Sequence, residues 1–158
     1  MKPSELEITS HSPEETNEIG IQIGKIAQTG DVILLVGDLG AGKTCLTQGI
    51  AWGLGIDDYA LSPSFVIMRE LYGRLPLYHM DLYRLEHLEE VMDLGLDEYL
   101  YGCGICVVEW ADRALSLLPL EHLLIEITAK ENQRKFRFVA NNEHYRDMLD
   151  RLWQTLRG

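Results

Sequence analysis

The chain is organised around a strand and a glycine-rich loop, which read Val32-Ile33-Leu34-Leu35-Val36 and then Gly37-Asp38-Leu39-Gly40-Ala41-Gly42-Lys43-Thr44. The loop fits the phosphate-binding pattern G-x-x-x-x-G-K-[ST]. The run before it is β-branched and apolar, as in a buried parallel strand, and the stretch from Cys45 to Leu54 has no proline and can form a helix. Strand, loop and helix in this order are the context that the motif requires, so the sequence predicts a nucleotide-binding P-loop.

Each residue type in this loop has a physical role. Glycines let the backbone curl so that successive N–H groups point at one phosphate, and the helix N-terminus adds a partial positive charge. Lys43 is expected to reach the β- and γ-phosphates, and the Thr44 hydroxyl to bind Mg²⁺. The alternative is a glycine-rich turn with a chance lysine and threonine, which would leave the agreement of both flanks with the motif unexplained.

Composition limits the class of protein. With 158 residues, 46% of them apolar, the chain is expected to form one globular domain over residues 1–158. No apolar run approaches the roughly 20 residues that span a bilayer, and the N-terminus lacks a signal-peptide pattern, so we expect a cytoplasmic protein without membrane contact. The net charge of −11 argues against direct high-affinity binding to nucleic acid and is compatible with a basic protein partner.

A cluster of basic residues and a pair of cysteines each have two possible interpretations. A basic cluster at Lys130, Arg134, Lys135 and Arg137 is read as a solvated hairpin in preference to a nucleic-acid site. The pair Cys103 and Cys106 has C-x-x-C spacing, but there is no second pair for zinc, and Cys106 falls inside an apolar run. Buried structural cysteine is therefore the preferred interpretation, and a redox role stays open.

The order of elements predicts an α/β fold, a P-loop NTPase-type three-layer sandwich with a mixed, mostly parallel sheet and an added β-hairpin. Ser12 is expected to cap the first helix with Pro13 at its first position, and Glu15 to close a capping box. The expected helices cover residues 13–28, 45–54, 88–94, 95–100, 112–118 and 142–156, and the expected strands 5–10, 32–36, 65–72, 75–83, 104–109, 123–129 and 135–140.

Chemistry on a Mg²⁺-bound nucleotide needs a carboxylate beyond the P-loop, typically at the end of a strand. Glu109 ends the more apolar run and Asp81 ends a more polar one. We expect Glu109 beside Mg²⁺ and Asp81 as a water-positioning group nearby. The alternatives are an ion pair of Asp81 with Arg84 and a solvated carboxylate at Glu109.

Three further features have two interpretations each. Ser62-Pro63-Ser64 is either a segment that senses the γ-phosphate or an ordinary Ser-Pro turn. Trp110 is expected to serve packing, either in the core or at an interface. His79, inside a strand, is expected to be a satisfied structural histidine.

Several segments of the chain together resemble the bacterial TsaE family (formerly YjeE), the ATPase of tRNA threonylcarbamoyladenosine biosynthesis. The resemblance covers nearly the whole chain and depends on four blocks in order, Gly37–Thr44, Ser62-Pro63-Ser64-Phe65, Tyr78-His79-Met80-Asp81-Leu82-Tyr83-Arg84 and Val108-Glu109-Trp110. Ser64 stands where the family usually has threonine, and Cys45 where threonine is common.

This resemblance implies a Mg²⁺-dependent ATPase, weak alone, that binds ATP and supports the TsaB–TsaD pair. That pair places a threonylcarbamoyl group on adenosine 37 of tRNA, which the chain itself would meet only indirectly. By position, the P-loop from Gly37 to Cys45 would bind the phosphates, and Thr44 and Glu109 would lie at the metal. With Asp81, which is expected from its place at a strand end, Lys43 and Glu109 are the predicted catalytic residues. The segment from Ser10 to Thr16 would lie near the adenine, and Arg134 near the nucleotide.

Other functions on the same loop remain to be compared. A small-molecule or nucleoside kinase would need an arginine-bearing lid, for which only Arg69 and Arg74 are candidates. A GTPase would need an Asn/Thr-Lys-x-Asp guanine motif, which Thr128-Ala129-Lys130-Glu131 does not supply. A non-enzymatic scaffold would leave an intact P-loop without a use.

Overall fold

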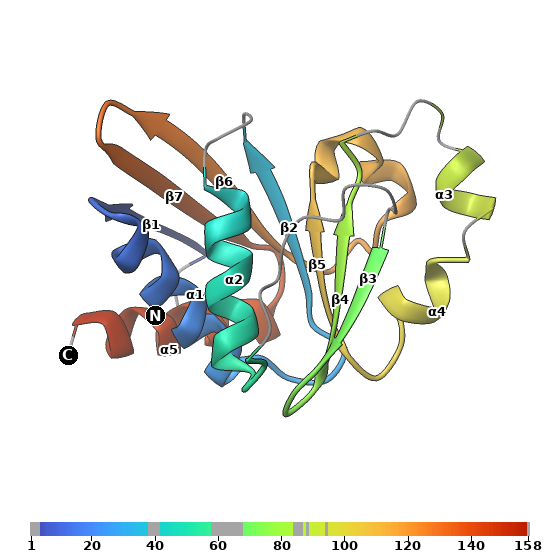
Figure 1. Cartoon of the computed structure of the whole chain (residues 1–158), viewed down its shortest axis with the longest axis horizontal. Coiled ribbons are helices and arrows are strands. Elements are labelled where there is room, and N and C mark those ends of the chain that lie inside the picture. Colours follow the sequence, from blue (N-terminus) through green and yellow to red (C-terminus); the bar gives the residue numbers. More distant parts are fainter. Residues whose placement is uncertain are drawn as a thin grey trace.

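The protein is a seven-stranded sheet with helices on both faces (Figure 1). The computed structural model describes residues 4–37, 42–57, 68–83, 87, 89–93 and 95–157. The strands are β1 (Glu5–Ser10), β2 (Val32–Gly37), β3 (Met68–Tyr72), β4 (Pro76–Asp81), β5 (Ile105–Glu109), β6 (Leu123–Lys130) and β7 (Gln133–Ala140). The helices are α1 (Pro13–Ile26), α2 (Lys43–Gly53), α3 (Glu89–Asp93), α4 (Asp97–Leu100) and α5 (Glu143–Arg157), with 3₁₀ segments η1 (Ala111–Arg113) and η2 (Leu115–Leu117).

The sheet has a parallel centre and antiparallel flanks. Its order is β1-β7-β6-β2-β5-β4-β3, in which β2 runs parallel to β5 and β6, and β4 parallel to β5. The β3–β4 and β6–β7 hairpins and the β1–β7 pair are antiparallel. This confirms the predicted α/β sandwich with a mixed sheet and an added hairpin, but the sheet is not mostly parallel, because three of the six described strand pairs are antiparallel. The order gathers the carboxyl ends of β2, β4 and β5 at one edge.

Side-chain alternation along the central strands separates two apolar cores. Ile33, Leu35 and Val107 face the core that holds buried residues of α1, α2 and α5. Val32 and Val108 face the opposite core, which includes residues of α4 and of the η1–η2 segment. Strands β2 and β5 are therefore buried on both faces, which explains why their sequences are continuous apolar runs.

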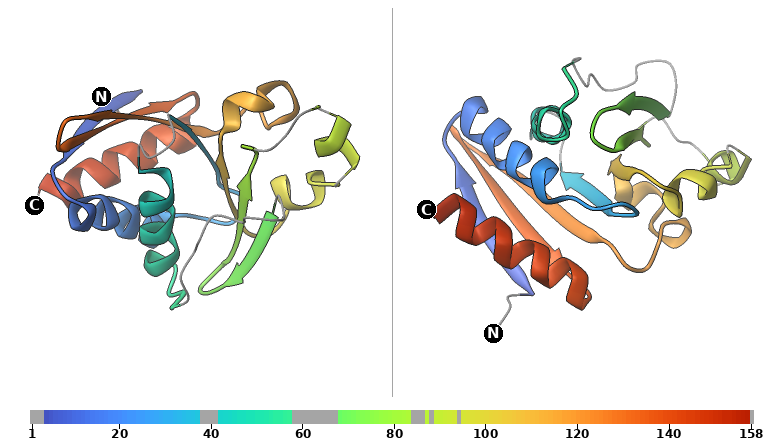
Figure 2. Two further views of the ribbon diagram at one scale, coloured as in Figure 1. Left: turned by 45° about the horizontal axis from the view of Figure 1, so that its top comes forward. Right: turned by 90° about the horizontal axis from the view of Figure 1, so that it is seen from below.

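Helices α1 and α2 lie side by side on one face of the sheet (Figures 1 and 2). Glycines make this close approach possible, because a Cβ added at Gly20 would lie 2.4 Å from the Leu46 carbonyl oxygen and one at Gly49 would lie 2.3 Å from that of Asn17. Gly24 and Gly53 meet one turn further along in the same way. The P-loop helix is thus fixed against its neighbour by backbone contact.

The start of α1 follows the prediction with one change. Ser12 is the N-cap, its hydroxyl accepts the N–H of Glu15 at 3.1 Å, and Pro13 holds the first helical position. The Glu15 carboxylate accepts the N–H of His11 at 2.5 Å, one residue before the N-cap that a capping box would use. This bond ties the end of the loop after β1 to the helix.

The helix expected over residues 112–118 is wrong. Two 3₁₀ turns, η1 and η2, replace it, and Ala114 between them has an extended φ of −147°. Ala111, Ala114 and Leu118 are buried in the core opposite α2, and Leu118, the residue before Pro119, is extended with φ −95° and ψ 157°. A residue before proline disfavours the helical conformation, which accounts for the end of the segment at Leu118.

None of the helices in the described ranges has the length and apolarity that a bilayer crossing demands. The short helices α3 and α4 project from the edge of the sheet near β3 and β4 (Figure 1). Residues 65–67 of the expected strand 65–72 lie outside the described residues, and the rest of it forms β3.

Candidate functional site

The carboxyl ends of β4 and β5 bring the two expected carboxylates together. Asp81 and Glu109 are direct partners in the parallel β4–β5 register, and Glu109 pairs with Leu35 of β2 on its other side. Alternation along β5 puts Glu109 on the same face as Val107, the face that packs against α2. The carboxylates therefore lie at the sheet edge from which the P-loop leaves β2.

Lys43, the P-loop lysine, points toward this edge. It is only 5% exposed, and its Nζ donates to the carbonyl oxygen of Gly37 at 2.5 Å. The same Nζ lies 4.1 Å from the ring centroid of Trp110, the residue after Glu109. A nearly buried ammonium beside an aromatic face has a strong cation–π attraction, so Trp110 helps to hold the lysine at the strand ends.

Trp110 is more than the packing residue that the sequence suggested. It has a left-handed backbone, with φ 58° and ψ 40°, a conformation that a bulky residue rarely adopts. Its ring also packs on Tyr83 at 4.9 Å between centroids. Strain of this kind persists where surrounding contacts enforce it, and here it aims the indole ring at Lys43.

Glu109 is 2% exposed and contacts the fully buried His79, whose Nε2 hydrogen-bonds to Glu109 Oε2. The sequence suggested a satisfied structural histidine, and that interpretation is wrong in one respect. Within the described residues, Nδ1 of His79 has no hydrogen-bond partner. His79 lies two residues before Asp81 and so shares its face of β4, but its contact with Glu109 depends on the pairing of β4 with β5.

Asp81 is the more accessible of the two carboxylates. Its Oδ1 accepts the N–H of Tyr83 at 2.9 Å. Burial raises the pKa of the Asp81 carboxyl above its usual value and the charge of Glu109 raises it further, whereas the Tyr83 N–H, His79 and Lys43 lower it. The suggested ion pair with Arg84 falls on a residue outside the described ranges.

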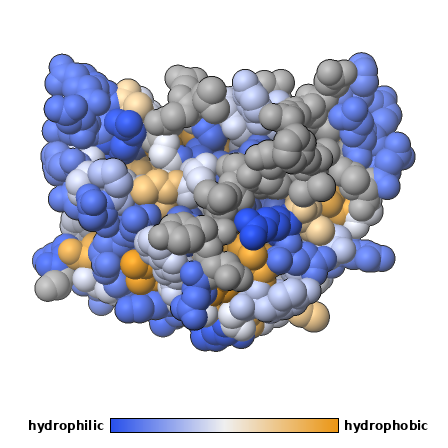
Figure 3. Space-filling model, viewed as in Figure 1, coloured by the Kyte–Doolittle hydropathy of each residue, from blue (hydrophilic) through white to orange (hydrophobic). Residues whose placement is uncertain are grey.

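A pocket of about 610 Å³ lies beside the P-loop helix, between the start of α1 and the β6–β7 turn. Four residues that the sequence assigned to the nucleotide line it, namely Thr16, Gly42, Cys45 and Arg134. The full lining is His11, Ser12, Pro13, Thr16, Gly42, Cys45, Glu131, Asn132 and Arg134. Hydrophilic side chains cover the projecting β6–β7 tip on this side (Figure 3).

Cys45 lines this pocket, whereas Ser10 does not. Ser10 is buried behind the wall, where its hydroxyl shares a hydrogen bond with Thr16 Oγ1 at 2.8 Å. The Cys45 thiol donates to Asn17 Oδ1 at 3.2 Å, and burial, with a smaller contribution from Glu14, raises its pKa. Cys45 is thus a neutral link between α2 and α1 at the pocket floor.

The remaining P-loop residues divide into two sets. Gly37 and Gly42 are described, and Gly42 has φ 115°, which a side chain would strain. Thr44 lies exposed in the first turn of α2. The other expected phosphate contacts, Asp38, Leu39, Gly40 and Ala41, and the Ser62-Pro63-Ser64 segment lie outside the described residues.

The donor set at this edge fits Mg²⁺. Thr44, Asp81 and Glu109 offer hydroxyl and carboxylate oxygens, the hard ligands that this ion prefers. Within the described residues there is no cluster of three or more His, Cys, Asp or Glu that could hold a metal by itself.

Two of the four basic residues, Lys135 and Arg137, form ion pairs within the sheet. Arg137 bridges Glu5 at 2.7 Å and Glu126 at 2.8 Å across three strands, and Lys135 pairs with Glu7 at 3.4 Å. The expectation of buried cysteines is confirmed for Cys106 and wrong for Cys103, which is exposed. Cys106 is buried and its thiol donates to the Tyr99 carbonyl oxygen at 3.1 Å. Burial raises its pKa to about 12, so it stays a thiol.

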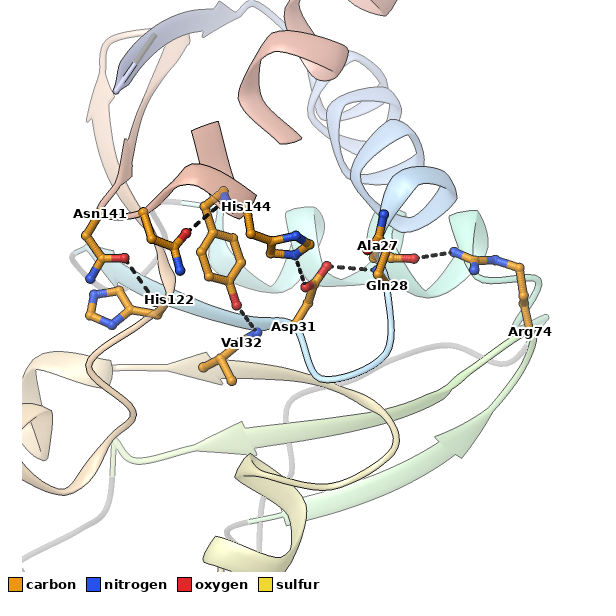
Figure 4. Close-up of polar contacts among 10 residues, drawn as sticks. Ala27, Gln28, Asp31, Val32, Arg74, His122, Asn141 and His144 are labelled. Atoms are coloured by element: carbon orange, nitrogen blue, oxygen red, sulfur yellow. Dashed lines mark hydrogen bonds and ion pairs between the residues drawn. The ribbon is translucent and has the colours of Figure 1, made fainter. Parts of the chain in front are cut away.

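The hairpin arginine considered for a kinase lid lies at the opposite end of the molecule. The Arg74 guanidinium donates to the carbonyl oxygens of Gly24 at 2.8 Å and Ala27 at 2.9 Å, at the C-terminus of α1 (Figure 4). It is therefore a helix-capping residue, remote from Lys43 at the start of α2.

Comparison with known proteins gives one consistent family. The model of "Threonylcarbamoyl adenosine biosynthesis protein TsaE" matches residues 10–136. The tRNA threonylcarbamoyladenosine biosynthesis protein TsaE of Bacillus subtilis is 48% identical over 143 residues, which cover 89% of each chain. Its counterpart in Treponema pallidum is 45% identical over 114 residues, 72% of this chain and 84% of that one. The crystal structure of Bacillus subtilis YdiB superposes with a TM-score of 0.83 at 41% identity, covering 96% of this chain and 95% of the other.

Proposed function

The chain belongs to the TsaE family of tRNA threonylcarbamoyladenosine biosynthesis, and from this premise we propose that it is a Mg²⁺-dependent ATPase of that pathway. In this proposal it binds and hydrolyses ATP in support of the TsaB–TsaD complex, which modifies N6 of adenosine 37 in tRNA. The observation that carries the proposal is the meeting of Lys43, Asp81 and Glu109 at the edge of the sheet where the P-loop begins.

The P-loop side would bind the triphosphate. Lys43 would exchange its bond to the Gly37 carbonyl oxygen for the β- and γ-phosphates, and the N-terminus of α2 would add its partial positive charge. Thr44 and Glu109 would hold Mg²⁺. Bound there, the ion would neutralise the charge that develops on the phosphate oxygens.

The two carboxylates would divide the work. Glu109, deep in the site and held by His79, suits a fixed ligand. Asp81 is more accessible, and burial has already raised the pKa of its carboxyl, so it suits the task of orienting the attacking water. Both act on one phosphate because their strands are adjacent and in register.

The nucleoside would extend into the 610 Å³ pocket. Thr16 and Arg134 would contact it from the α1 wall and the β6–β7 turn, and Cys45 would lie beside the phosphates. Ser10 would act from behind, by fixing the Thr16 hydroxyl.

The acidic surface supports a protein partner over direct contact with tRNA. The net charge is −11. Two basic side chains of the β6–β7 hairpin, Lys135 and Arg137, form ion pairs with glutamates of β1 and β6, which reduces the positive charge that they offer to a phosphate backbone. The position of Arg74 removes one of the two arginines on which a small-molecule kinase would have depended.

The experiment is steady-state ATP turnover of the full chain, with and without purified TsaB and TsaD, for the wild type and Lys43→Ala. We expect weak turnover alone, stimulation by the pair, and a loss of at least about 100-fold in Lys43→Ala, because the charge that stabilises the transition state is removed. Lys135→Ala is the matched control, since Lys135 is an exposed lysine paired with Glu7.

Three outcomes would overturn the proposal. One is undiminished turnover in Lys43→Ala. Another is turnover that needs a small acceptor molecule and ignores TsaB and TsaD, which would favour the kinase. A third is the absence of ATP hydrolysis by the wild type under both conditions.

A further inference from the structure

The buried contact between His79 and Glu109 has a role that the proposed ATPase chemistry does not by itself explain. We propose that His79 is a positioning residue, which holds the Glu109 carboxylate in one orientation from the interior of the protein. The catalytic part of this inference rests on the proposed function, whereas its physical part can be tested in the nucleotide-free protein.

The geometry makes His79 a fixed support. His79 is 0% exposed and Glu109 is 2% exposed, and they project from adjacent parallel strands onto the α2 side of the sheet. His79 pairs in register with Val107, one alternation before Glu109, so the imidazole approaches the carboxylate from the interior. An imidazole ring enclosed in this way has little rotamer freedom. Its hydrogen bond therefore restricts the Glu109 side chain, which would otherwise be free to change rotamer at the end of its strand.

The hydrogen-bonding pattern assigns the direction of the bond. An ionised carboxylate only accepts, so Nε2 of His79 carries the proton and donates to Glu109 Oε2. In the neutral ring, Nδ1 is then an acceptor, and among the described residues it has no partner. Among the described residues, the imidazole ring therefore makes one hydrogen bond, the one that Nε2 donates to Glu109.

The unsatisfied Nδ1 also argues against a role in packing alone. A buried polar atom without a partner costs free energy, which leucine or phenylalanine at the same position would avoid. Replacing a buried pair by apolar residues is often neutral or stabilising, so stability does not account for the histidine. Orientation of a ligand does, because imidazoles and carboxylates behind the ligands of metal sites commonly set ligand geometry.

Near-isosteric variants at position 79 separate positioning from packing. The amide nitrogen of glutamine lies near the place of Nε2, and that of asparagine near Nδ1. His79→Gln should therefore keep the donor to Glu109, whereas His79→Asn and His79→Leu should lose it. We expect kcat for ATP to fall about 10- to 100-fold in the Asn and Leu variants and to be largely recovered in the Gln variant. KM for ATP, and Kd for ADP without Mg²⁺, should stay within about twofold of the wild-type values, because the variants leave the proposed contacts of Lys43 and Thr44 with the nucleotide unchanged.

A second background tests whether His79 acts through Glu109. In Glu109→Gln, which has already lost the charged carboxylate, the further change His79→Leu should alter kcat by less than about twofold. Two results would overturn the proposal and leave His79 a structural role. One is a fall in kcat from His79→Leu that is as large in the Glu109→Gln background as in the wild type, and the other is a kcat for His79→Asn equal to that for His79→Gln.

Thermal unfolding of the nucleotide-free protein supplies a readout independent of ATP turnover. The single variants His79→Leu and Glu109→Gln and the double variant form a cycle, and we expect Tm shifts that are non-additive by at least about 3 °C. Additive shifts would overturn the direct coupling. If the wild type hydrolysed no ATP, the proposed function would fail, and this cycle would still decide the coupling.

Discussion

Carboxylate–imidazole pairs in which the carboxylate is buried occur at both ends of the central parallel strands. At the carboxyl end, Glu109 meets His79, with side-chain exposures of 2% and 0%. At the amino end, Asp31 meets His144, with exposures of 3% and 41%. The two pairs consist of the same chemical groups, but their surroundings differ.

The amino end is a set of satisfied main-chain contacts (Figure 4). The second oxygen of Asp31 accepts the N–H of Gln28 at 2.8 Å and closes the turn before β2, while Tyr145 Oη accepts the N–H of Val32 at 2.9 Å. His144 reaches solvent. Each polar group here joins one backbone segment to another, so the pair stabilises the junction of α1, β2 and α5.

The carboxyl end holds features that stability alone would not select. A second carboxylate, Asp81, lies beside Glu109. Burial raises the pKa of Asp81, and the negative charge of Glu109 raises it further. Trp110 has a left-handed backbone, and Nδ1 of His79 is unsatisfied among the described residues. Burial and an imidazole partner are thus common to both carboxylates. A second carboxylate, a strained neighbouring backbone and a P-loop lysine occur together only beside Glu109, and the proposed role of Glu109 depends on them.

The largest expected effect separates the two carboxylates by activity. Glu109→Gln should lower ATP turnover, measured with TsaB and TsaD present, by at least about 100-fold, because the charge that faces the nucleotide is lost. Asp31→Asn should leave turnover within about twofold and lower Tm, because it weakens the bond to His144. Similar losses of turnover in both variants would break the comparison.

A smaller effect is expected from the amino end alone. Arg74→Ala should lower the free energy of unfolding by about 1–2 kcal/mol, because the carbonyl groups of Gly24 and Ala27 lose their donor. Urea denaturation measures this loss. Turnover well below the unfolding midpoint should not change, and a reduced kcat in this variant would mean that the β3–β4 turn communicates with the site.

Arg74→Lys is the matched variant for this measurement. It keeps the charge but replaces the planar fork by a single ammonium group, so an intermediate stability is expected. Full stability in Arg74→Lys would show that charge near the end of α1, not the paired geometry, is what matters there.

The smallest effect concerns alkaline stability. Burial, as the largest cause, raises the pKa of Tyr145 to about 12, so the folded state favours the neutral phenol. Stability from this group is complete below about pH 10, where unfolded tyrosine ionises, and is lost as the pH rises toward 12. Tyr145→Phe should cost about 1 kcal/mol at pH 8, by leaving the Val32 N–H without its acceptor, and should flatten the decline above pH 10. An unchanged alkaline slope in the variant would contradict the assignment.

Part of the site was predictable because its signals are local. The strand, loop and helix around Lys43 follow from apolar patterning and glycine placement, and the Ser12 cap follows from residue type. Glu109 and Asp81 were found because carboxylates that end apolar strands gather at one edge of a parallel sheet.

Other contacts were missed because they join distant segments. No local pattern relates His79 to Glu109 or Trp110 to Lys43, since each contact depends on strand order and register. The close packing of Gly20 on α2 is likewise invisible in α1 alone.

The sequence by itself determined the α/β class, the phosphate-binding loop and the pair of acidic strand ends, because backbone propensity and hydrophobic periodicity act over a few residues. Only the tertiary structure decided that Asp31 closes a turn and that His79 contacts Glu109. Both contacts depend on burial, register and the electrostatic field of neighbouring strands, which exist only once the sheet has assembled.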